Sequence, residues 1–346
     1  MRKAKAFLLG MIITASVSAP SAVFAAGPAS IIEFVDASGA DSAVFQDPSA
    51  SCHSRLPDWE LSIVEGTYNR FAAKRADADC RAAFGKAAHD FTDKEKAMLT
   101  RYVTQIDSVA GVEFPVLNHL PWRFVVISDA FDRGVPNVGR YIVLTKGLLK
   151  EMQEWAEKKS SMFFVGMEIL IREKALLLQN NRRETFEKFY TEVWGFRKIP
   201  ALSIDRPMQD NGIFLSRVPP NEWVIKLSPK DKEYIMPALL LRDAGKDGGG
   251  TAQRVAITID STSKGFLPRK GKKALIEYRD LRLIPYYRKK FPLSEYDYHP
   301  TEISVDLLTK YTVMKYVSAH YGTAPTKISE YSQIDVLMKM LDAGAK

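Results

Sequence analysis

Cysteine is scarce in this chain, and long apolar runs and common nucleotide-binding motifs are missing. Only two cysteines occur among 346 residues, so at most one intrachain disulfide can form. No unbroken apolar run approaches the ~20 residues that a transmembrane helix needs. The sequence contains no phosphate-binding P-loop, no G-x-G-x-x-G fingerprint and no G-x-S-x-G elbow. These absences disfavour a membrane-spanning protein, the common nucleotide-binding enzymes and a serine hydrolase of the α/β type.

The overall composition is that of a soluble protein with a large core. Hydrophobic residues make up 46% of the chain and charged residues 26%, and the formal net charge is +8 at pH 7. The length is typical of about two domains or one large domain. The order of the expected elements, with helices and strands in separate runs, predicts an α+β fold with one main body over 26–346.

The first 25 residues have the three parts of a cleavable export signal. Arg2, Lys3 and Lys5 form a basic start, the segment 7–17 is mostly apolar, and a small-x-small exit ends at Ala25. The apolar segment is too short to cross a bilayer. We therefore expect a mature protein of lower positive charge that is exported to the periplasm or secreted.

Both cysteines lie in the expected mature chain. Export to an oxidising compartment favours a disulfide between Cys52 and Cys80, which would stabilise the fold by roughly 3 kcal/mol in the chain-entropy model. The alternative is a metal site that adds His53 and His89. Its spacing fits no closed zinc pattern, so the disulfide is the preferred interpretation.

Residue periodicity predicts the elements of the mature chain. Thr92 and Glu95 form a capping box, which marks the start of a helix. The segment 162–179 is apolar on nearly every face and should be a buried helix. Segment 26–56 has no period and is expected to be an extended lead-in, and 245–250 a flexible turn. The expected helices are 59–84, 92–109, 146–158, 162–179, 183–193, 301–320 and 327–341, and the expected strands are 122–127, 141–144, 222–227, 234–241 and 254–259.

One stretch of the buried helix carries a recognisable pattern. The residues I-R-E-K-A-L-L-L-Q at 171–179 resemble the I-H-E-K-x-H-x-L-Q helix of a family of zinc metallopeptidase-like proteins of the H-E-x-x-H type. In that pattern two histidines four residues apart bind the metal, and the glutamate activates a water molecule. Arg172 and Leu176 stand at the two histidine positions, and Glu173 matches the general base.

A second segment extends the resemblance toward the C-terminus. The residues Y-H-P-T-E-I-S-V-D at 298–306 are similar to the H-P-x-E-I-x-A-D segment that supplies a glutamate as third ligand in such gluzincin-type proteins, and Glu302 matches that glutamate. The resemblance covers about 140–320. It implies a mostly helical metallopeptidase-like body with a small mixed sheet and a buried helix that carries the degenerate site.

The two replaced histidines decide the expected function. Arg172 would place a fixed cation close to the metal position, where two charges about 4 Å apart repel by about 4 kcal/mol at an effective dielectric of 20. Leu176 offers no lone pair. The sequence therefore predicts an inactive pseudopeptidase without zinc or any other cofactor, which acts by binding an unidentified peptide or envelope component.

Two other functions stay open. The first is an active hydrolase with an atypical site of Glu173, Glu302, His299 and Asp306, whose oxygen ligands would suit Mg²⁺, Ca²⁺ or Mn²⁺. The second is an envelope scaffold or interaction protein with no ligand groove. Metal content distinguishes the first alternative from a pseudopeptidase.

Arg172 needs a carboxylate partner if it is buried. A buried helix without any family relationship would pair it with Glu168, four residues earlier. The resemblance instead implies that the two site helices face each other, so that Arg172 bridges them to Glu302, with Glu168 or Glu173 as a second acceptor.

Basic clusters are the remaining candidate binding features. One comprises Arg269, Lys270, Lys272 and Lys273, and another spans 288–290. They are expected either to contact anionic lipid or polymer or to be solvated loops. Nucleic-acid binding is not expected of an exported protein.

Overall fold

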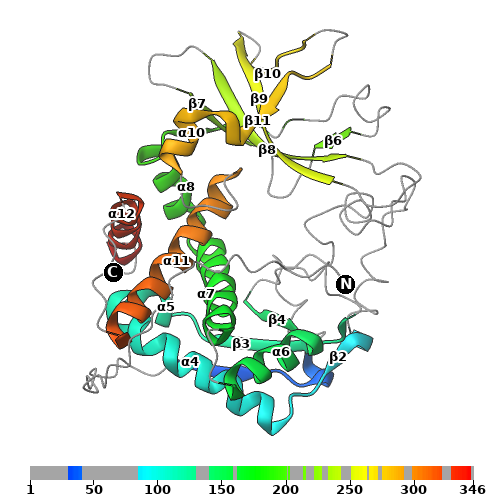
Figure 1. Ribbon diagram of the computed structural model, residues 1–346, viewed down its shortest axis with the longest axis vertical. Coiled ribbons are helices and arrows are strands. Elements are labelled where there is room, and N and C mark those ends of the chain that lie inside the picture. Colours follow the sequence, from blue (N-terminus) through cyan, green and yellow to red (C-terminus); the bar gives the residue numbers. More distant parts are fainter. Residues whose placement is uncertain are drawn as a thin grey trace.

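The computed structural model (Figure 1) describes residues 30–40, 85–129, 140–158, 162–200, 202, 213–215, 222–227, 233–242, 251–262, 265–271, 275–291, 298–321 and 329–343. The expected export signal, Cys52 and Cys80, the expected helix at 59–84 and the turn at 245–250 lie outside these residues. The described part is mixed helix and sheet, so the α+β class predicted from the sequence is confirmed.

A four-stranded mixed sheet lies at one end of the molecule (Figure 1). Its central strand is β3 (Trp122–Ile127), whose β-branched and aromatic residues are buried at five of six positions. The parallel strands β1 (Ile32–Phe34) and β4 (Ile142–Thr145) and the antiparallel β2 (Ala88–His89) all pair with β3. The segment 26–56, expected to be an extended lead-in, thus contributes one strand to the sheet.

Three helices pack near this sheet. α4 (Asp93–Glu113) begins at the predicted capping box, where the Thr92 side chain accepts from the Glu95 amide and the Glu95 carboxylate accepts from the Thr92 amide. α5 (Pro115–Asn118) leads into β3, and α6 (Lys146–Glu157) follows β4 directly. The helices predicted at 92–109 and 146–158 are therefore confirmed.

Two long helices connect the two ends of the molecule (Figure 1). α7 (Met162–Asn181) is the predicted buried helix, and its buried side chains are concentrated between Leu170 and Gln179. α11 (Pro300–Tyr321) runs beside it. α8 (Arg183–Glu192) and α12 (Ser329–Ala343) complete the helical body, and the Trp194 indole donates to Gln333 at 2.7 Å to hold α12 near α8.

A seven-stranded antiparallel sheet forms the other end, and the sequence predicts only three of its strands. β7 (Trp223–Lys226), β8 (Tyr234–Arg242) and β9 (Thr251–Thr262) are the predicted ones. The additional strands have three or four residues each, too few for a periodic signal, and pair with longer partners. They are β5 (Phe196–Lys198), β6 (Ile213–Leu215), β10 (Gly265–Pro268) and β11 (Tyr278–Asp280).

Alternate residues of this sheet enter two different cores. Ile235 and Ala256 join the main core of the helical body, whereas Met236, Val255 and Ile257 belong to a separate cluster on the opposite face. A short 3₁₀ helix, η4 (Leu281–Leu283), and α10 (Pro285–Lys290) follow β11. Within the described residues, no helix is long and apolar enough to cross a membrane.

Candidate functional site

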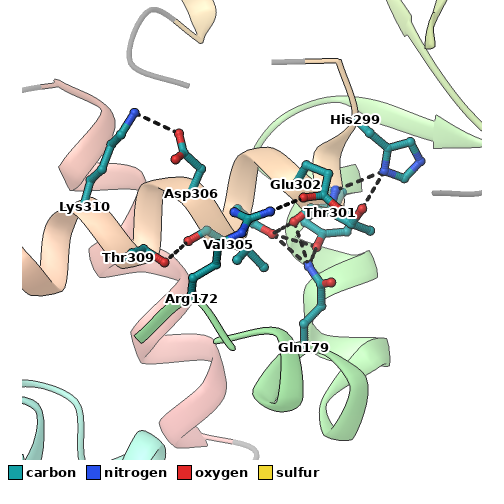
Figure 2. Close-up of polar contacts among 11 residues, drawn as sticks. Arg172, Gln179, His299, Thr301, Glu302, Val305, Asp306, Thr309 and Lys310 are labelled. Carbon is teal, nitrogen blue, oxygen red and sulfur yellow. Dashed lines mark hydrogen bonds and ion pairs between the residues drawn. The ribbon is translucent and has the colours of Figure 1, made fainter. Parts of the chain in front are cut away.

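The candidate site lies where α7 and α11 face each other (Figure 2). Arg172 on α7 donates from Nη2 to Oε2 of Glu302 on α11 at 2.5 Å, although 130 residues separate them in the chain. The side chain of Arg172 is 24% exposed and that of Glu302 only 8%. This contact, the Arg172–Glu302 bridge, is a charge-assisted bond at short distance between two helices.

The other motif positions of α7 differ in their burial. Leu176, one turn after Arg172, is buried, so the second histidine position of the resemblance holds an apolar side chain in the core. Glu173 is half-buried. Glu168, one turn before Arg172, is exposed.

His299 and Asp306 have local partners of their own. The His299 ring is buried, and its Nδ1 lies 2.7 Å from Thr301 Oγ1 and accepts from the Thr301 amide at 3.3 Å (Figure 2). It therefore caps the first turn of α11. The buried Asp306 forms an ion pair with Lys310 at 3.1 Å, one turn later on the same helix.

A buried polar network ties α7, α8 and α11 together near the bridge. The Gln179 amide donates to the Tyr190 hydroxyl at 2.7 Å, to Ser304 Oγ at 3.0 Å and to the Thr301 carbonyl at 3.0 Å. Tyr190 and Ser304 lie 2.9 Å apart. Burial raises the pKa of the Tyr190 hydroxyl well above its usual range, so it stays neutral. The network was not predicted, although polar residues within two otherwise apolar helices are a signal for it.

Lys174 is buried, although it belongs to the charged group at 172–174. The residue is 1% exposed. Its Nζ donates to the Leu120 carbonyl and lies 4.3 Å from the centre of the Trp122 ring. Burial lowers the pKa of Lys174 to about 7, and the charge of Asp107 opposes that shift.

Asp107 completes this second buried polar group. The Trp122 indole donates to its carboxylate at 3.3 Å, and burial raises the pKa of Asp107 above its ordinary value. Lys174 extends from α7 on the side away from Arg172, since two residues correspond to about 200° of helical rotation. The group thus links α7 to α4 and β3, and it is distinct from the bridge.

The residues at the bridge do not fit a metal centre. Across the described ranges, no group of three or more His, Cys, Asp or Glu side chains is arranged to hold a metal ion. More directly, the cationic Arg172 stands at the position of the first expected histidine, and Glu302 already accepts a hydrogen bond from it. A divalent ion at this point would have to displace the guanidinium.

The first basic cluster is largely committed to internal contacts where the structure describes it. Arg269 forms ion pairs with Asp260 at 2.5 Å and with Glu233 at 2.6 Å. Lys272 and Lys273 lie outside the described residues. In the second cluster, Lys290 Nζ donates to the Trp194 carbonyl, and burial lowers its pKa.

Comparison with known protein families, with curated proteins and with solved structures gave no match for this chain.

Proposed function

We propose that this chain is an exported metallopeptidase-like protein in which an ion pair has replaced the metal, and that it acts by binding a peptide or an envelope component rather than by hydrolysis. The observation that carries the proposal is the Arg172–Glu302 bridge. It joins α7 and α11, the two helices whose motifs carry the resemblance. Arg172 and Glu302 each stand at a position that matches a metal ligand in the family pattern.

Electrostatics supports a role for the bridge as a substitute for the metal. A buried carboxylate without a countercharge is costly or becomes protonated. The guanidinium meets that need with a fixed positive charge, because arginine does not lose its proton in proteins. Leu176 removes the second ligand position at the same time. Glu173 is retained, but a general base has no metal-bound water to activate here.

The contacts of the remaining carboxylates and His299 favour this function over an atypical hydrolase. His299 Nδ1 is engaged by Thr301, and Asp306 is engaged by Lys310. Glu302 is engaged by Arg172. Glu302 and Asp306 therefore each pair with a cation that a metal would have to displace.

Metal analysis of the purified full chain tests the proposal. We expect less than stoichiometric Zn²⁺, Mg²⁺, Ca²⁺ or Mn²⁺ after dialysis, and no cleavage of unstructured peptides. One tightly held metal per chain, together with hydrolysis that chelation abolishes, would establish the hydrolase instead.

A double substitution tests the geometry that the resemblance implies. Arg172→His with Leu176→His places two imidazoles four residues apart on α7 opposite Glu302, and we expect it to bind one Zn²⁺ per chain. Arg172→His with Leu177→His is the matched control, because both leucines are buried but residue 177 lies on another side of the helix. Equal zinc binding by the two double variants would argue against the resemblance.

A further inference from the structure

The segment formed by η4 and α10 exposes apolar and basic side chains together. Leu283 is 76% exposed and Tyr286 36%, which places both among the few large hydrophobic residues at the described surface. Arg288 and Lys289 are exposed on the same short segment. We call these four residues the α10 surface. Figure 1 shows α10 at the periphery, beside the seven-stranded sheet.

The opposite side of the same segment is firmly anchored. Leu281, Ile284, Tyr287 and Phe291 are buried, and the Phe291 ring packs 5.3 Å from that of Trp194 in the main core. With Tyr287 directed inward, helical rotation places Lys289 on the outward face, with Tyr286 and Arg288 on its two flanks. The exposed residues are thus held on a rigid support.

The charge of the segment is strongly positive. Between 279 and 290 the sequence has five basic residues and one acidic residue. The acidic residue, Asp280, pairs with Arg282 at 2.7 Å, and Lys290 is directed toward the Trp194 carbonyl. Arg279, Arg288 and Lys289 are exposed on the same segment as Leu283 and Tyr286. The segment therefore combines a basic field with protruding apolar groups.

We infer that the α10 surface docks the protein onto an anionic lipid bilayer. Basic side chains attract acidic headgroups, while an exposed leucine and a tyrosine suit the boundary between headgroups and acyl chains. An acidic polymer would satisfy the charges but offers no apolar phase for Leu283. The inference does not depend on the proposed function. It assigns lipid contact to α10 rather than to the cluster at Arg269, because Arg269 is held in ion pairs.

Vesicle co-sedimentation of the full chain tests this inference. We expect binding to vesicles of phosphatidylglycerol and phosphatidylcholine, weak binding to phosphatidylcholine alone, and weaker binding as salt rises. Arg288→Glu with Lys289→Glu should lower the partition coefficient on anionic vesicles by about 30-fold or more. Leu283→Ser should lower it by about tenfold.

Matched variants distinguish the contribution of the α10 surface from general effects of net charge and of exposed apolar side chains. Lys94→Glu with Lys96→Glu makes the same change of net charge on exposed residues of α4, and Ile31→Ser removes another exposed apolar side chain. Both should bind vesicles like the unmodified chain, and all variants retain the same first 25 residues. Equal losses in the α10 and control variants would overturn the inference. The inference would also be overturned if Leu283→Ser left vesicle binding unchanged while soluble polyglutamate abolished it. That result would indicate an acidic polymer as the partner.

Discussion

At the scale of single residues, the Arg172–Glu302 bridge shows how an ion pair can occupy the junction of two helices. Glu302 is nearly buried and Arg172 is about a quarter exposed, so the pair is only partly screened by water. Removal of one partner leaves the other charge in a poorly solvated position. Removal of one partner should therefore destabilise the fold more than replacement of both partners by apolar residues.

Arg172→Ala should lower the free energy of unfolding by about 2 to 3 kcal/mol, because it strands the Glu302 carboxylate. Chemical denaturation measures this, and a double-mutant cycle with Glu302→Gln should give a coupling of about 1 kcal/mol or more. Lys188→Ala, which removes an exposed partner of Glu192 at 3.9 Å, is the control and should cost less than ~0.5 kcal/mol. A cycle without coupling would show that the bridge does not stabilise the fold.

Lys174 makes stability depend on pH in a defined direction. Its pKa is about 7 in the folded chain, against an ordinary value of 10.5. Below pH 7 the amine is protonated in both states and the folded chain carries the full cost of burying the charge. Between pH 7 and about 10 the unfolded chain binds more protons, so the free energy of unfolding rises with pH by about 4 kcal/mol from this group.

Lys174→Met should remove most of that rise while filling a similar volume. Denaturation at pH 6.5, 8 and 9.5 would show a flatter profile than that of the unmodified chain. Lys188→Met, at an exposed position on α8, should leave the profile unchanged. Parallel profiles for the unmodified chain and Lys174→Met would contradict the assigned pKa.

At the scale of elements, Gly166 allows α7 and α4 to approach closely. A Cβ at this position would lie 2.6 Å from the Tyr102 hydroxyl oxygen. Tyr102 cannot move aside easily, because it stacks on Phe163 at 4.3 Å and donates to the Met152 carbonyl at 3.2 Å. The glycine is therefore required by packing between helices rather than by backbone conformation.

Gly166→Ala should destabilise the protein by about 1 to 2 kcal/mol, since the steric cost exceeds the gain in helix propensity. Thermal denaturation would show a lower Tm. Gly271→Ala is the control, because the nearest atom to its Cβ would be 3.8 Å away. An unchanged or raised Tm for Gly166→Ala would mean that α4 and α7 can separate without cost.

At the scale of the whole molecule, the seven-stranded sheet and the helical body share one core. Neighbouring residues of β8, such as Ile235 and Met236, belong to the main core and to the outer cluster respectively. If the packing on one face of the sheet is lost, residues that belong to the core on the other face are exposed as well. The two ends of the molecule should therefore unfold together.

Unfolding in denaturant should give one transition, with coincident curves for tryptophan fluorescence and far-UV circular dichroism. The tryptophans report on both ends, since Trp122 lies in the mixed sheet and Trp223 in the antiparallel sheet. An early loss of strand signal, with the helical signal retained, would instead identify the antiparallel sheet as a separate domain.

Much of the element order was predictable, because long segments carry periodicity and capping signals of their own. Thr92 and Glu95 mark the start of α4, and the β-branched residues of β3 define that strand. The short strands β5, β10 and β11 carry no such signal. They form because β7 and β9 offer unpaired edges, which is a property of the assembled sheet.

The sequence by itself determined the α+β class, the main helices and the candidate pair of site segments. The tertiary structure set the 2.5 Å distance between Arg172 and Glu302, and it alone turned Lys174 rather than Glu173 into the core. The reason is physical: local sequence specifies a helix, but its rotation about its own axis depends on what it packs against. For α7 that is Trp122 and the Leu120 carbonyl on one side and α11 on the other.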